Sequence, residues 1–69
     1  MEKFAKRLKD LRIGKGITQI QLAYDTKISK SSIGAWELGI SVPNANAVIT
    51  LARYFDVSCD YLLGESDVI

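Results

Sequence analysis

The segment TQIQLAYDTKISKSSIGAWELG, residues 18–39, has the pattern of two short helices separated by a tight turn. Thr18 can cap the first helix with its hydroxyl, and Gln21, three residues later, completes a capping-box pattern. Ser29 can cap the second helix, and Gly39 follows directly after its expected end. These start and stop signals predict a closely spaced helical pair.

The apolar positions of this pair match the packing that two crossing helices need. Ala23 places a small side chain where the helices would cross, and Ile28 can plug the turn between them. Ile33 and Trp36, three residues apart, can anchor the second helix to the core. Two short helices with these spacings have the proportions of a helix-turn-helix.

The second helix of the pair, about residues 29–37, carries mostly small side chains on its remaining faces. A glycine inside a helix costs about 1 kcal/mol relative to alanine, so a helix built only for stability would not carry one at position 34. Small residues let a helix backbone approach another surface closely. The small residues of this helix are Ser29, Ser31, Ser32, Gly34 and Ala35.

A further helix is indicated before the pair. Phe4, Leu8 and Leu11 recur at positions i, i+4 and i+7, with lysines on the opposite side. This spacing predicts an amphipathic helix over residues 2–13. The GKG sequence that follows, residues 14–16, is a strong helix-breaking signal.

Two more capping residues complete a five-helix pattern. Asn44 can cap a fourth helix that runs to about Phe55, and Ser58 can cap a short fifth helix that ends at a glycine. No stretch gives a credible strand signal, so the expected fold class is all-α. We expect a compact five-helix domain over residues 1–64 and a C-terminal tail over residues 65–69.

The composition excludes several classes of function. The 69 residues include one cysteine and no histidine, so neither a disulfide nor a zinc site is expected, and no metal or other cofactor is implied. The chain has no glycine-rich phosphate loop and no paired-carboxylate signature, so we expect neither an enzyme nor a small-molecule site. Without a signal-peptide pattern or a membrane-length apolar run, a cytoplasmic protein without membrane contact is the expectation.

The net charge of +1 conceals an uneven distribution along the chain. Residues 1–15 carry six Lys and Arg against two Asp and Glu, whereas residues 40–69 carry one Arg against four Asp and Glu. Residues 16–39 are balanced. Such asymmetry can orient a protein towards a polyanion, although on charge alone a solvated helix face is an equally good interpretation.

With these features in place, the chain resembles the Cro and phage-repressor family of helix-turn-helix DNA-binding domains (lambda repressor-like, XRE). The most specific matching pieces are GITQIQLA at 16–23, SIGAWELG at 32–39 and DYLLG at 60–64. The resemblance implies a domain that binds double-stranded operator DNA as a homodimer, with its third helix in the major groove. It also implies a sequence-specific transcriptional regulator, and a repressor rather than an activator.

The resemblance assigns roles to individual residues. Lys30, Ser31 and Ala35 fall where base-contacting side chains project, and a lysine, a hydroxyl and a methyl group suit guanine, either base type and the thymine methyl, respectively. Ser29 and Ser32 would donate to phosphates, which fix register without reading sequence. The full set of expected DNA-binding residues is Thr18, Gln19, Ser29, Lys30, Ser31, Ser32, Gly34, Ala35 and Ser41.

Two further roles follow from the same resemblance. Gln19 stands at the start of the first helix of the pair, where it would bind a phosphate and brace a side chain of the second helix. Arg12 and Glu37 match a structural ion pair that, in similar domains, bridges the end of the first helix to the end of the third.

The chain departs from the family pattern in the turn and in the following loop. Lys27 stands where a left-handed glycine is usual, with an expected strain of about 1 kcal/mol. Ile40 and Ser41 replace the cations that often contact phosphates after the third helix. An alternative function is therefore a protein-interaction module or antitoxin-like partner with weak or non-specific DNA binding.

The remaining conspicuous side chains are expected to serve structure. Helical spacing predicts that the aromatic residues pack in the core, and Cys59 is expected to be a buried thiol. An exposed apolar surface is expected from Ile40, Val42, Val68 and Ile69, and the aromatic set is Trp36, Tyr54, Phe55 and Tyr61.

Overall fold

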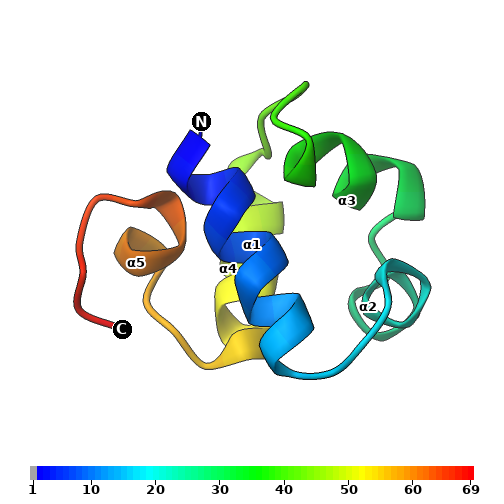
Figure 1. The fold of residues 1–69 in the computed structure, drawn as a ribbon, viewed down its shortest axis with the longest axis horizontal. Helices are drawn as coiled ribbons and strands as arrows, with labels where there is room; N and C mark the ends of the chain where they lie inside the picture. The colour runs from blue at the N-terminus through cyan, green and yellow to red at the C-terminus, as the bar shows by residue number, and fades with distance from the viewer. Residues whose placement is uncertain (1) are drawn as a thin grey trace.

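The computed structural model describes residues 2–69, and within them the chain forms five α-helices and no strand (Figure 1). The predicted all-α fold class is confirmed, and each helix begins and ends within a residue or two of the predicted positions. The helices are α1 (Glu2–Gly14), α2 (Gln19–Thr26), α3 (Lys30–Glu37), α4 (Ala45–Phe55) and α5 (Cys59–Leu63).

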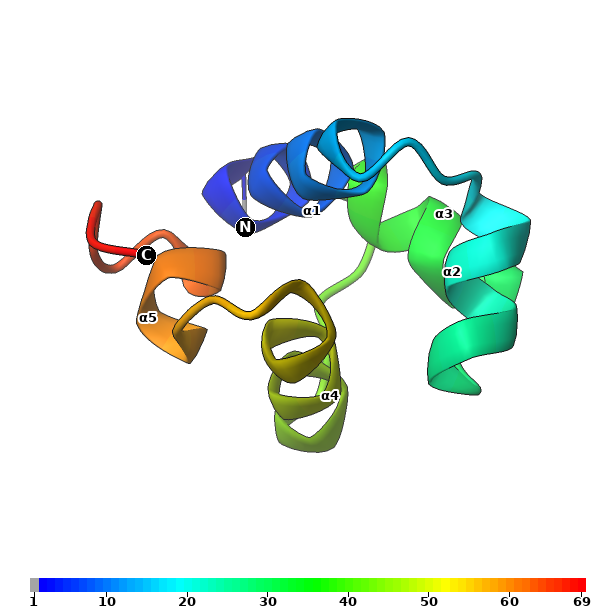
Figure 2. The ribbon, with the colours of Figure 1, turned by 90° about the horizontal axis from the view of Figure 1, so that it is seen from below.

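The helices are arranged around a central pair. Helices α1 and α4 lie in the middle of the molecule, α2 and α3 lie at one end, and α5 lies at the other end with the C-terminus (Figures 1 and 2). The molecule measures 27 × 23 × 20 Å along its principal axes. The helix-turn-helix and the C-terminal segment therefore occupy opposite ends of the domain.

Every helix contributes at least one fully buried side chain to a single core. Phe4 of α1 packs edge-on against Trp36 of α3, with ring centroids 6.2 Å apart. Burying six large apolar side chains at about 1.5–3 kcal/mol each is a substantial driving force for so short a chain. The six are Phe4, Leu8, Leu22, Ile33, Leu51 and Leu62.

The predicted N-caps are present, but the capping box at the start of α2 is only half formed. The Thr18 hydroxyl accepts a hydrogen bond from the Gln21 backbone N–H at 3.1 Å. The Gln21 amide does not return to Thr18; it donates instead to Asp25 one turn later, at 2.8 Å. A partner at i+4 on the same helix face competes successfully for this side chain.

The turn and the end of α3 both use left-handed backbone. Lys27 adopts φ 62° at the end of α2. This is the left-handed conformation that glycine usually adopts at this place in the family. Gly39 has φ 74°, its N–H donates to the Trp36 carbonyl, and the Ile40 N–H donates to the Ala35 carbonyl. This pair of bonds is a Schellman motif, which satisfies the last carbonyls of α3 and stops the helix before the loop.

The aromatic residues are less uniformly buried than predicted. Trp36 is in the core, whereas Tyr54 and Phe55 are half-buried at its margin. Tyr61 stacks on the Arg7 guanidinium, because that cation occupies the groove between α1 and α5. Cys59 is half-buried against the core rather than fully enclosed.

Candidate nucleic-acid interface

The helix-turn-helix presents one buried and one open side. Ile33 and Trp36 anchor α3 in the core, and Ala23 and Ile28 are half-buried against it, as the packing pattern predicted. Helix α2 crosses α3 at the end of the molecule (Figure 2). The N-terminal part of α3 is consequently left open, although both helices are firmly seated.

The predicted DNA-binding residues differ in exposure. The N-cap and the first two residues of α3 are exposed, whereas the residues after them are half-buried or buried. The exposed ones are Thr18, Ser29, Lys30, Ser31 and Ser41, and the half-buried ones are Gln19, Ser32, Gly34 and Ala35.

Three serine hydroxyls meet at the start of α3. Ser29 caps the helix by accepting from the Ser32 backbone N–H at 3.1 Å, and its own hydroxyl donates to the Ser32 hydroxyl at 2.8 Å. The Ser31 hydroxyl lies 3.3 Å from that of Ser29. Because the Ser29 proton is used within this cluster, the proton of Ser32 is the one left to donate outward. The family resemblance assigned phosphate contacts to both serines, whereas their hydrogen bonds in the structure differ.

A largely buried ionic network ties α3 to α1 and α2. Arg12 makes two parallel bonds to the Glu37 carboxylate, from Nε at 2.7 Å and from Nη2 at 3.0 Å. A third Arg12 bond, from Nη1, reaches the Ile17 carbonyl at 2.9 Å. The side chains of Arg12 and Glu37 are only 13% and 4% exposed. The hydrogen bond to Glu37 raises the pKa of Arg12 above its ordinary value, so the guanidinium stays protonated.

Gln19 joins the same network from α2. Its Nε2 donates to the Glu37 Oε1 at 3.1 Å, so the amide braces the end of α3. A Cβ built on Gly34 would lie 3.6 Å from the Gln19 Oε1, an ordinary contact distance. The glycine therefore lies beside Gln19, and an alanine would fit there without displacing it.

The open side carries little positive charge. Within residues 16–41 the cations are Lys27 and Lys30, and the Lys27 ammonium lies 4.8 Å from the centre of the Tyr24 ring. The one acid on α3, Glu37, is neutralised by Arg12. The surface therefore offers hydroxyl and methyl groups with a small number of cations.

Two clusters of side-chain hydrogen bonds were not predicted from the sequence. Arg7 binds the C-terminal segment, and Tyr54 of α4 donates to the Asp25 carboxylate of α2 at 2.6 Å. Neither cluster has a local sequence signal, because the partners are far apart in the chain. Residues 2–69 contain no group of three or more metal-ligating side chains and no helix long and apolar enough to cross a membrane.

The domain has five helices, and a three-residue turn joins α2 to α3. This arrangement defines a helix-turn-helix domain. The comparison with protein families agrees: a model described as "Helix-turn-helix domain" matches residues 5–68. The chain belongs to this family, and the resemblance inferred from the sequence is confirmed.

The relatives are bacterial transcription regulators by name. The chain is 36% identical over 66 residues to the HTH-type transcriptional activator BcrR of Enterococcus faecalis, covering 96% of the chain and 32% of that protein. It is 41% identical over 64 residues to the uncharacterized HTH-type transcriptional regulator YobD of Bacillus subtilis, covering 93% and 57%. It is 33% identical over 63 residues to the HTH-type transcriptional regulator ImmR of the same organism, covering 91% and 50%.

The chain thus spans no more than 57% of the length of these three relatives. No solved structure shows a significant match to it.

Proposed function

We propose that this chain is the sequence-specific DNA-binding domain of a cytoplasmic transcriptional regulator, with a binding rather than an enzymatic role. The observation that carries the proposal is the seating of α3. Its inner face is buried, its far end is fixed by Arg12 and Gln19 through Glu37, and its N-terminal residues are exposed. A rigid helix with a free N-terminal face is what entry into a major groove requires.

In this proposal, few side chains read bases directly. Lys30 donates to guanine, Ser31 contacts either base type, and Ala35 touches a thymine methyl group. Ser32 and Gln19 contact phosphates, with Ser29 holding Ser32 in place. Because these side chains are short, the remaining discrimination comes from DNA shape and deformability.

A homodimer completes the proposed binding unit. Leu38, Ile40 and Val42, in the loop after α3, are 75%, 74% and 63% exposed, and residues 38–52 contain no charged side chain. Two copies can therefore meet beside their α3 helices without charge repulsion. A symmetric dimer would read two half-sites about 34 Å apart.

Regulation by such a dimer is most simply repression, since a protein bound at a promoter excludes other proteins from it. One relative carries the name of an activator. The sign of regulation is therefore measured with a reporter gene placed behind the bound DNA fragment. A rise in reporter output on expression of the protein would replace repression by activation.

The primary experiment titrates DNA fragments from around the protein's own gene against random DNA at two salt concentrations. We expect a preference of about 10³ or more for one fragment. With few cations on the open side, we expect a shallow salt dependence, with each phosphate-bound cation adding about 0.9 to the slope of log affinity against log salt. Equal and weak binding to all fragments would contradict sequence-specific binding.

Variants identify the surface. Replacing Gln19 and Lys30 together by alanine should abolish the preference while the helical circular dichroism is retained. In a separate variant, Gly34→Ala should stabilise the domain by about 0.5–1 kcal/mol, because it removes a helix glycine and its methyl group fits. If Gly34→Ala also weakens DNA binding, α3 docks closely enough to need the bare position; unchanged binding would show that it does not.

The second candidate function is a protein-interaction module, and the exposed apolar loop at Leu38, Ile40 and Val42 favours it. The two functions separate in one experiment. Retention of specific DNA binding in the Gln19 and Lys30 double variant would mean that another surface binds DNA. Absence of specific binding in the unaltered protein would favour the interaction module.

A further inference from the structure

The end of the domain opposite the helix-turn-helix contains a basic hollow. It has a volume of about 310 Å³ and lies between α1 and α5. Its lining carries three cations and one carboxylate, so its net charge is positive. The lining residues are Lys3, Lys6, Arg7, Asp10 and Tyr61.

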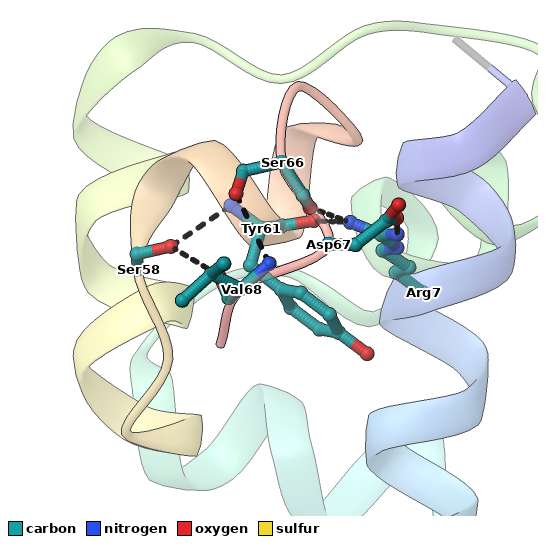
Figure 3. Close-up of polar contacts among 6 residues, drawn as sticks. All are labelled: Arg7, Ser58, Tyr61, Ser66, Asp67 and Val68. Atoms are coloured by element: carbon teal, nitrogen blue, oxygen red, sulfur yellow. Dashed lines mark hydrogen bonds and ion pairs between the residues drawn. The ribbon is translucent and has the colours of Figure 1, made fainter.

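The Arg7 side chain in this hollow is held in place by several contacts (Figure 3). Its Nη1 donates to the carbonyls of Tyr61 and, at 2.6 Å, Ser66, and its guanidinium carbon lies 4.1 Å from the centre of the Tyr61 ring. These contacts hold the guanidinium between the end of α5 and the segment that follows it. The side chain is 18% exposed, so the cation is presented in one orientation.

The chain already places a carboxylate on this cation. Asp67 accepts one hydrogen bond from the Arg7 Nη2 at 2.7 Å, while its own side chain is 95% exposed. The segment is held further by a bond from the Ser58 hydroxyl to the Val68 carbonyl at 3.3 Å (Figure 3). The carboxylate itself therefore has a single anchor and can leave without uncovering the core.

The guanidinium is not saturated by Asp67. Within residues 2–69, the Arg7 Nε makes no hydrogen bond, and Nη2 uses one of its two protons. A guanidinium binds a carboxylate best through two parallel bonds, which Asp67 does not make. A carboxylate that reached both nitrogens would be a better ligand than the one now in place.

The flanking lysines extend the same preference. Lys3 and Lys6 line the hollow beside Arg7, and Asp10 compensates one charge by its 2.7 Å ion pair with Lys6. A second carboxylate spaced along a peptide would meet Lys3. The site therefore suits a chain of acidic side chains better than a single anion.

From these contacts we propose that Arg7, Lys3 and Lys6 form a docking site for an acidic segment of a partner protein, which displaces Asp67. The hollow is lined by residues of α1 and α5, and α5 lies at the end of the molecule opposite α2 and α3 (Figures 1 and 2). DNA bound at α3 would leave it uncovered. The site is thus available to a protein partner whether or not the domain is on DNA, and it does not depend on the proposed function.

The test is a nuclear magnetic resonance titration of the protein with an end-blocked hexaglutamate peptide at low salt. We expect chemical-shift changes at the Arg7 Nε–H, at Tyr61 and at residues 66–68. Asp67→Asn should bind the peptide about two- to fivefold more tightly, because a competing surface ion pair is removed. Lys3→Gln with Lys6→Gln should weaken binding by at least a similar factor, with the Arg7 contacts intact.

Lys9→Gln is the matched control, because it removes an exposed cation of α1 that does not line the hollow. It should leave the affinity within about twofold. An equal loss in Lys9→Gln, shift changes confined to α3, or an unchanged affinity in Asp67→Asn would overturn the proposal. So would duplex DNA shifting the same α1 and α5 signals, because the hollow would then be a phosphate contact.

Discussion

Arg7 and Arg12 leave the same helix five residues apart, and each holds one end of the domain by a different kind of contact. Arg12 makes a two-bond pair with Glu37, whose side chain is 4% exposed. Arg7 donates one hydrogen bond to Asp67, whose side chain is 95% exposed. Its other two hydrogen bonds go to backbone carbonyls. The same residue type thus serves a fixed junction at the helix-turn-helix and a replaceable one at the C-terminal segment.

The difference follows from solvation. A buried ion must keep its partner, because water is not available to replace it. An exposed carboxylate loses little when its partner leaves, since water and salt ions screen the charge. The orientation of α3 therefore depends strongly on Glu37, whereas the position of Asp67 is energetically cheap to change.

The largest effect in this comparison is expected for Glu37→Gln. The substitution keeps the shape but leaves the Arg12 charge buried and poorly paired, so unfolding free energy should fall by about 3–5 kcal/mol. Urea denaturation followed by circular dichroism measures the loss. A domain of this size has a total stability of only about 3–10 kcal/mol, so the variant should be partly unfolded at growth temperature.

Two controls sharpen that prediction. Asp10→Asn breaks the exposed Lys6–Asp10 pair and should leave the free energy of unfolding almost unchanged. Replacing Arg12 by Met together with Glu37 by Leu should recover most of the stability, because no charge is then left buried. A loss below 1 kcal/mol in Glu37→Gln would mean that water solvates this pair and that burial of the carboxylate does not distinguish the two ion pairs.

At the α5 end of the domain, Arg7→Gln should lower the free energy of unfolding more than Asp67→Asn does. Arg7→Gln removes the donors to two carbonyls and should cost about 1–3 kcal/mol. Asp67→Asn should cost less than about 1 kcal/mol, because its pair is at the surface. Thermal unfolding of both variants at one ionic strength makes the comparison, and equal losses would show that Asp67 carries the contact.

The sequence predicted the parts of the molecule that are encoded locally. Serine, threonine and asparagine caps marked the helix starts, and glycines marked several ends, so the five helices and their core faces could be assigned. The meeting of Arg12 with Glu37 was inferred from family resemblance rather than from spacing.

The Arg7 contacts could not be predicted, and their chemistry explains why. Two of its acceptors are backbone carbonyls, which every residue has and which leave no pattern in a sequence. Its carboxylate partner is 60 residues away and depends on how the segment after α5 folds back. Tyr61 was assigned to the core for the same reason: its helical spacing gave no sign of the cation lying over its ring.

The smallest effect on stability is expected for the exposed hydrogen bond between Tyr54 of α4 and Asp25 of α2. It tests whether burial, or location at the helix-turn-helix end, determines how much a contact contributes to stability. The Tyr54 hydroxyl donates to Asp25, and this bond raises the pKa of Tyr54 above its ordinary value of 10.0. Since the folded state favours the protonated phenol, this contribution to stability is complete below about pH 10 and is lost as pH rises through the raised pKa. Phenolate absorbance measures the shift.

In Asp25→Asn the carboxylate charge is gone, so the pKa of Tyr54 should return towards 10.0 and the alkaline loss of stability that this residue causes should shrink. Carrying out both titrations with Tyr24 and Tyr61 replaced by phenylalanine isolates the Tyr54 signal. Because the pair is exposed, Asp25→Asn should change neutral-pH stability far less than Glu37→Gln, although both residues serve the same end of the molecule. A loss as large as that of Glu37→Gln would make location, rather than burial, the property that separates the two ends.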